Sequence, residues 1–272
     1  MRAMNLFMAD ARRIKKSKAL LIILCVALGY SLLYISLMKL ADYLTSLIEF
    51  AVPQMDFGKM ALGVVLGANT FVFIAAIGIG IFSGSEFAYN TVRNRIISGN
   101  SRTKIWFSQF LMNLAIFFAM YFAVAVFSTA LCALMFGGFA DFGGTMARLA
   151  LSLPLYVCMV AIITLVITGT KSLTLGLVIN LLVLMLVPQI LGMILMFIPN
   201  QTWVAVLETN PYIMLSKVLG SDMSSLIGGM AGGEAVALDP IKDVLKSILV
   251  AVCYGGLAIG GGVLAFNRTD IK

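Results

Sequence analysis

The sequence contains no histidine, and only 11% of its 272 residues are charged. Histidine is the commonest general base and metal ligand at neutral pH, so its absence removes the usual basis for acid–base catalysis or a metal centre. The cysteines have neither metal-ligand nor redox spacing, and all four lie in apolar stretches: Cys25, Cys132, Cys158 and Cys253. We therefore expect no catalytic residue and no metal site, and we interpret the cysteines as small buried hydrophobic residues.

A nucleotide-binding phosphate loop is also missing. Gly58–Lys59 and Gly169–Ser172 contain parts of the G-x-x-x-x-G-K-[ST] pattern but not its spacing. There is no H-E-x-x-H motif and no pair of aspartates inside an apolar stretch, so nothing indicates an intramembrane hydrolase. The sequence predicts that the chain is not an enzyme and does not hydrolyse ATP by itself.

Apolar residues are abundant instead, at 61% of the chain. Apolar runs of about 20 residues recur, and each is long enough to cross a hydrocarbon core of about 30 Å as a helix. The sequence predicts an all-α integral membrane protein, with residues 1–272 as one transmembrane domain. The six predicted spans are 19–38, 60–82, 105–136, 149–168, 173–198 and 247–266, and Pro188 is expected to kink the fifth.

The net charge of +7 comes from basic residues beside the predicted spans. Most of them fall in the N-terminal segment, in residues 83–104, at Lys171 and at the C-terminal end. The positive-inside rule then places both termini in the cytoplasm, which agrees with an even number of spans. Because this distribution explains the charge, we expect no binding of nucleic acid.

Two further segments lie outside the predicted spans. Residues 1–17 are basic and amphipathic, which is typical of a helix lying in the membrane interface; a plain basic tail is the alternative. The predicted outer loop, 199–246, contains apolar segments that are too short to cross the membrane. We expect short helices there that lie on the outer leaflet or re-enter it.

The centres of the predicted spans contain no Asp, Glu, Lys or Arg, although ion-coupled carriers usually need such groups at mid-membrane. The polar residues that these spans do contain are uncharged. They either line a substrate pathway or form interhelical hydrogen bonds worth about 0.6 kcal/mol each. The candidate pathway residues are Asn69, Thr70, Asn113, Asn180 and Gln189.

Residues 85–104 form a polar, basic island between the second and third spans. Asn90 and Thr91 are good helix-capping residues, and Gly99–Asn100 is a helix stop, so we predict a short helix over Thr91–Ser98. Val92, Ile96 and Ile97 would form its apolar face, with Arg93 and Arg95 on the other sides.

The pattern E-F-x-x-x-T-V-R-x-R-I-x-S-G-x-S-R, over residues 86–102, resembles the intracellular loop of type-two ATP-binding-cassette (ABC) permeases. Asn90 departs from the glycine often found before the threonine, and a proline often found near Asn100 is missing. The order of segments along nearly the whole chain is also similar to that family.

The resemblance implies that residues 1–17 are an elbow helix and that Phe87–Ser101 is a cytoplasmic coupling helix. That helix would seat in a groove on a separately encoded ATPase, which binds the ATP and Mg; this chain itself would hold no cofactor. The residues implied to couple to the ATPase are Glu86, Phe87, Thr91, Arg93, Arg95, Ile96, Ile97 and Arg102.

The resemblance also implies the subunit composition of the complex and its cellular location. Two ATPase copies would join two permease chains, either identical or close paralogues, in contact with the lipids of a bacterial cytoplasmic membrane. The complex would export an amphipathic or hydrophobic substrate, with antimicrobial or toxin peptides as one candidate. The alternatives are an ion-coupled secondary transporter or channel, and a membrane scaffold or sensor.

Overall fold

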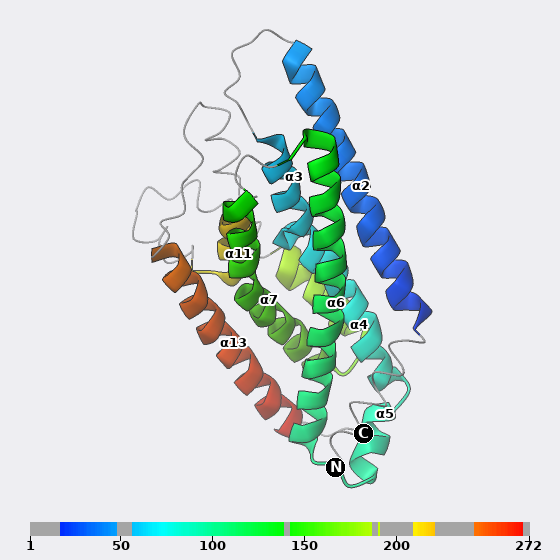
Figure 1. The fold of residues 1–272 in the computed structure, drawn as a ribbon. Helices are drawn as coiled ribbons and strands as arrows, with labels where there is room; N and C mark the ends of the chain where they lie inside the picture. Colours follow the sequence, from blue (N-terminus) through cyan, green and yellow to red (C-terminus); the bar gives the residue numbers. More distant parts are fainter. Residues whose placement is uncertain are drawn as a thin grey trace.

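The computed structural model describes residues 17–47, 56–138, 142–186, 190, 209–220 and 242–268, and the regular structure in these ranges is entirely helical. Figure 1 shows long helices running side by side as a bundle. Five helical segments of these ranges are long and apolar enough to cross a membrane: Lys18–Leu47, Phe57–Ala88, Arg102–Phe136, Phe142–Thr170 and Val244–Arg268. The prediction of an all-α protein is confirmed for these ranges, and the five apolar helices are compatible with a multi-pass membrane protein.

Each of the five segments is longer than the predicted span that it covers. The third, α6 (Arg102–Phe136), has 35 residues and so extends about 52 Å, well beyond a hydrocarbon core of about 30 Å. It ends where Gly137 adopts φ 79° and its N–H binds the carbonyl of Ala133. A hydropathy pattern marks only the apolar part of such a helix, whereas the helix continues until a residue of this kind ends it.

The second predicted span, 60–82, is not one regular helix. It consists of α3 (Phe57–Leu66), a π-helical turn η1 (Ala68–Val72) and α4 (Phe73–Ala88), with Gly67 in an extended conformation between α3 and η1. The break leaves the carbonyl of Leu66 without its usual helical donor, and the hydroxyl of Tyr156 donates to it at 2.5 Å. A distant tyrosine therefore completes the hydrogen bonding of the broken helix.

The fifth predicted span, 173–198, begins as expected with α8 (Leu173–Leu181), followed by a second π-helical turn, η2 (Leu182–Leu186). Apart from residue 190, its remainder lies outside the described residues, and so do Pro188 and its predicted kink. The count of six spans stays a prediction. A Cβ atom on Gly84 would meet Leu173, and one on Gly80 would meet Leu177, so α8 runs antiparallel to α4 at close range.

At the centre of the bundle is α7 (Phe142–Thr170), which packs against α4, α6, α8, α11 and α13. Four buried aromatic rings fill the space between α7, α6 and η1, with centroid distances from 4.9 to 6.1 Å: Phe71, Phe117, Tyr121 and Tyr156. By contrast, α2 (Lys18–Leu47) and α13 (Lys242–Arg268) direct many apolar side chains outward. Such outward apolar faces suit contact with lipid.

Of the predicted outer loop, 199–246, the structure describes α11 (Pro211–Leu219) and the start of α13. With nine residues, α11 is too short to cross a membrane. Asn210 caps it by accepting from the N–H of Tyr212 at 3.0 Å. It packs against α3 and α7, so closely that a Cβ atom on Gly63 would overlap the carbonyl oxygen of Leu219.

The start of α2, the short helix α5 (Thr91–Ile97) and the end of α13 lie at the same end of the bundle (Figure 1). This arrangement gathers Lys18, the basic residues of the island and Arg268 at one end. The predicted interfacial helix, 1–17, lies outside the described residues except for Ser17.

Candidate functional site

The short helix predicted in the polar island is present. It spans Thr91–Ile97, one residue shorter than predicted, and Gly99, with φ 85°, follows its end. The chain turns from α4 into α5 at Asn90, which has φ 54° and makes no side-chain capping bond. Asparagine tolerates this left-handed conformation better than most residues, so it serves here where a glycine is otherwise expected.

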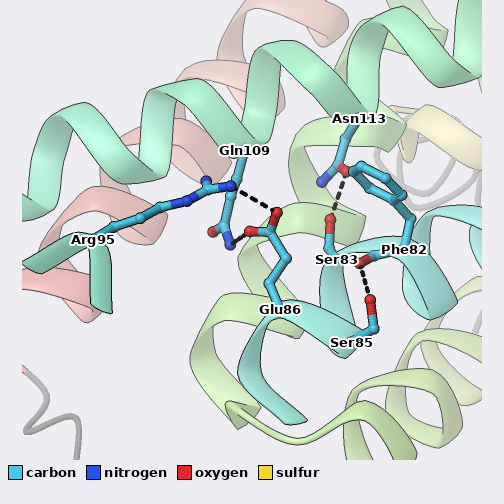
Figure 2. Close-up of polar contacts among 7 residues, drawn as sticks. All are labelled: Phe82, Ser83, Ser85, Glu86, Arg95, Gln109 and Asn113. Atoms are coloured by element: carbon cyan, nitrogen blue, oxygen red, sulfur yellow. Dashed lines mark hydrogen bonds and ion pairs between the residues drawn. The ribbon is translucent and has the colours of Figure 1, made fainter. Parts of the chain in front are cut away.

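A buried carboxylate joins α5 to the two long helices on either side of it (Figure 2). Glu86, in the last turn of α4, is 1% exposed. Its Oε1 lies 3.2 Å from Nη2 of Arg95 on α5, and its Oε2 accepts from Nε2 of Gln109 on α6 at 2.6 Å. One side chain therefore connects three consecutive helices, and a charge-assisted hydrogen bond forms part of the connection.

The two arginines of α5 have opposite environments. The side chain of Arg95 is 11% exposed and lies against Glu86, whereas Arg93 is exposed. The three residues predicted to share an apolar face are likewise separated: Val92 is buried, Ile96 packs on the core, and Ile97 is 74% exposed. The prediction of a single apolar face was wrong. In a helix of only seven residues, the sequence does not show which side packs against α4 and α6.

The exposed side of α5 presents a small mixed surface, here called the tip patch: Tyr89, Arg93 and Ile97. Arg93 and Ile97 are four residues apart and so lie on one face of the helix, and Tyr89 is 76% exposed in the turn before it. Of the other residues implied in coupling, Phe87, Thr91 and Arg102 are partly buried.

A second polar rung lies one turn deeper between α4 and α6. The hydroxyl of Ser83 donates to Oδ1 of Asn113 at 2.6 Å, and Nδ2 of Asn113 donates to the hydroxyl of Thr164 on α7 at 3.0 Å. Ser83 and Glu86 follow one face of α4, and Gln109 and Asn113 follow one face of α6. Figure 2 shows both rungs between the two helices; together they are called the polar ladder below.

The start of α6 is also joined to the end of α13. Nη1 of Arg102 donates to the carbonyl of Asn267 at 3.0 Å, and Nδ2 of Asn267 donates to Thr103 at 3.3 Å. One turn further along α6, the ring of Trp106 fills the space above Gly262, where a Cβ atom would come within 2.5 Å of it. The helix that follows the island is therefore held both by α4 and by α13.

The five candidate pathway residues do not form one group. Both amide atoms of Asn113 are used between helices, as the interhelical alternative expects. Asn180 is buried, and its Nδ2 lies 3.4 Å from the carbonyl of Ile163, while its Oδ1 has no hydrogen-bond partner within the part of the chain that the structure describes. Thr70 is in η1, which contacts η2; the side chain of Asn69 and all of Gln189 lie outside the described residues.

The cysteine prediction needs a correction. Cys132 and Cys158 are buried, but Cys25 and Cys253 are exposed on α2 and α13. These two helices lie at the edge of the described bundle, so an apolar position on them does not have to face its interior.

Three residues of the site were missed in the sequence, Ser83, Gln109 and Trp106, and so was Tyr156 at the break of the second span. One signal was available for Gln109, because Gln109 and Asn113 are four residues apart in a mostly apolar span and so share a helix face. Nothing local distinguishes Tyr156, whose partner is 90 residues away.

Comparison with models of known protein families, with curated proteins and with solved structures found no match.

Proposed function

We propose that this chain is the membrane-spanning permease subunit of an ATP-driven ABC exporter. The observation that carries the proposal is α5, a short helix between two spanning helices that exposes the tip patch. A buried ion pair fixes it to α4, and the same carboxylate is hydrogen-bonded to Gln109 of α6. A helix so fixed moves with the two spans, so a partner that pushes on it would act on the membrane domain directly.

The partner would be an ATPase encoded separately, because the chain has no phosphate loop. Two ATPase copies and two permease chains would form the transporter in a bacterial cytoplasmic membrane, with both termini in the cytoplasm. ATP and Mg would bind to the ATPase. The cargo would be amphipathic or hydrophobic, with antimicrobial or toxin peptides as one class, because the spans are apolar at their centres.

Coexpression with a candidate ABC ATPase from the same organism tests this function. We expect the two chains to copurify and ATP hydrolysis by the complex to respond to the permease. Arg93→Glu should lower that hydrolysis, because it reverses the charge of the tip patch, while the chain still inserts. The matched control is Lys104→Glu, an exposed lysine of the same polar island that lies on α6. Failure to copurify, or equal effects of the two substitutions, would contradict the proposal.

A second candidate, an ion-coupled carrier, is favoured by one observation. Two predicted spans contain π-helical turns, η1 and η2, which contact each other, and the Oδ1 of Asn180 beside η2 has no hydrogen-bond partner among the described residues. Broken helices with unused oxygens are a common way to bind Na⁺ within a membrane. Uptake or release of substrate by vesicles that contain this chain alone, driven by an ion gradient, would support the carrier and not the exporter.

A further inference from the structure

We infer that Glu86 is a positioning residue: its carboxylate acts as a latch that holds α5, through Arg95, in one orientation against α4 and α6. The inference rests on the proposed function for the use of α5, but the latch itself is a property of this chain alone. It assigns different tasks to the two arginines, with Arg95 holding the helix and Arg93 facing the partner.

The first argument is that, among the described residues, the rest of α5 makes few contacts with the bundle beyond those of Val92 and Ile96. A helix of seven residues is not stable in isolation. Asn90 gives it no side-chain cap, and within α5 only Val92 is fully buried. Its end is closed by local bonds, from Gly99 N–H to Ile96 and from the Asn100 amide to Arg95, which shape the turn but do not attach it to the bundle.

The second argument is the geometry of the carboxylate. Glu86 presents one oxygen to Arg95 and the other to Gln109, so the orientation of α5 is tied to α6 as well as to α4 (Figure 2). Gln109 also lies one turn from Asn113, whose bonds to Ser83 and Thr164 fix that part of α6. The position of the carboxylate is thus set by contacts between α4 and α6 that do not involve α5.

The third argument is the cost of separating the pair. A buried ion pair gives less net stability than its Coulomb attraction suggests, but removal of one partner leaves the other charge buried and uncompensated. Arg95 belongs to a short helix at the end of the bundle and can turn toward water if Glu86 loses its charge. The expected result is local release of α5, with the spanning helices still packed.

Thiol labelling of the isolated full-length chain in lipid nanodiscs tests the latch. Val92→Cys places a reporter at a position that is 1% exposed on the inward face of α5. Cys25 and Cys253 are exposed and are replaced by alanine, while the buried Cys132 and Cys158 are kept as internal reporters of general loosening. The probe is a membrane-impermeant maleimide, and the measured quantity is its rate of reaction at residue 92.

In this background, Glu86→Gln and Arg95→Gln should each raise the labelling rate at residue 92 at least tenfold, with Cys132 and Cys158 still unreactive. Arg93→Gln is the matched control on the same helix and should leave the rate unchanged. Arg95→Lys retains the charge and should stay nearer to the parent than Arg95→Gln.

Two results would overturn the latch. One is a rate that changes less than twofold in both Glu86→Gln and Arg95→Gln. The other is labelling of Cys132 and Cys158 together with residue 92, which would make the pair a general stabiliser of the bundle. The labelling experiment contains no ATPase, so neither result bears on whether a partner docks on α5. That question is tested separately by Arg93→Glu in the complex with the ATPase.

Discussion

The hydroxyl of Tyr156 should stabilise the fold much more than the hydroxyl of Tyr121, although the two rings are neighbours. Their centroids are 4.9 Å apart, and both side chains are almost completely buried. Replacing either tyrosine by phenylalanine keeps the ring and removes one oxygen. The pair therefore isolates the hydrogen bond from the packing.

The structure gives different expectations for the two oxygens. Tyr156 donates at 2.5 Å to the carbonyl of Leu66, at the break in the second span. Tyr121 lies 3.3 Å from the carbonyl of Leu149, which Ser152 already supplies with a donor at 2.7 Å. Tyr156→Phe leaves a buried carbonyl without its side-chain donor, whereas Tyr121→Phe does not.

An orphaned buried polar group costs about 1–3 kcal/mol, and hydrogen bonds within membrane proteins are worth about 0.6 kcal/mol on average and up to about 1.7. We therefore expect Tyr156→Phe to lower the free energy of unfolding by about 1–2 kcal/mol, near the upper end of the membrane range. Tyr121→Phe should lower it by about 0.5 kcal/mol or less.

Reversible unfolding by sodium dodecyl sulfate in mixed micelles, followed by circular dichroism, measures both free energies under the same conditions. Equal losses for the two variants would refute the reasoning, because they would mean that the break at Gly67 does not depend on Tyr156. A larger loss for Tyr121→Phe would refute it more strongly.

Three further predictions use the same unfolding measurement. Gly262→Ala should lower the free energy of unfolding by about 1–3 kcal/mol through overpacking against Trp106. Gly256→Ala, where no atom lies within 4 Å of the new methyl group, should be neutral or slightly stabilising. Similar values for both variants would contradict the close packing of Gly262 against Trp106. Asn113→Leu removes two interhelical hydrogen bonds and should lower the free energy of unfolding by about 1 kcal/mol. A double-mutant cycle with Ser83→Ala should show a coupling of about 0.6 kcal/mol between the two residues. A coupling of zero would show that the hydrogen bond between Ser83 and Asn113 does not stabilise the fold. Burial raises the pKa of Tyr212 in α11 to about 12. The tyrosine therefore ionises at lower pH in the unfolded chain, and the free energy of unfolding should fall between about pH 10 and pH 12. Tyr212→Phe should lose less of this free energy than the wild type over that interval, and an identical decline would argue against the burial of Tyr212.

Predictions that depend on a local signal agree well with the structure. The helix of the polar island was predicted from local residues that favour helix ends, and it begins at Thr91 as expected, although Asn90 makes no side-chain capping bond. The long helices cover the predicted apolar stretches because burial of backbone polar groups in a membrane requires helices. Their ends are less predictable, since a helix continues past the apolar stretch until a residue such as Gly137 stops it.

Predictions that depend on which helices meet agree less well. The second span appears in the sequence as one apolar stretch, but the structure breaks it at Gly67, where Tyr156 from another helix supplies the missing donor. Asn113 had two readings, a pathway or a contact between helices, and its two hydrogen bonds favour the contact.

By itself, the sequence determined that the chain is helical, that its spans are long and apolar enough to cross a membrane, and that it contains a basic island but no phosphate-loop motif, because composition, length and motif are local properties. Only the tertiary structure decided the tasks within that island. Arg93 and Arg95 are two residues apart and chemically identical, yet one faces outward and the other pairs with a buried carboxylate. The physical reason is that burial of a charge requires a partner of opposite sign, and only the packing of α4, α5 and α6 brings Glu86 to one arginine and not to the other.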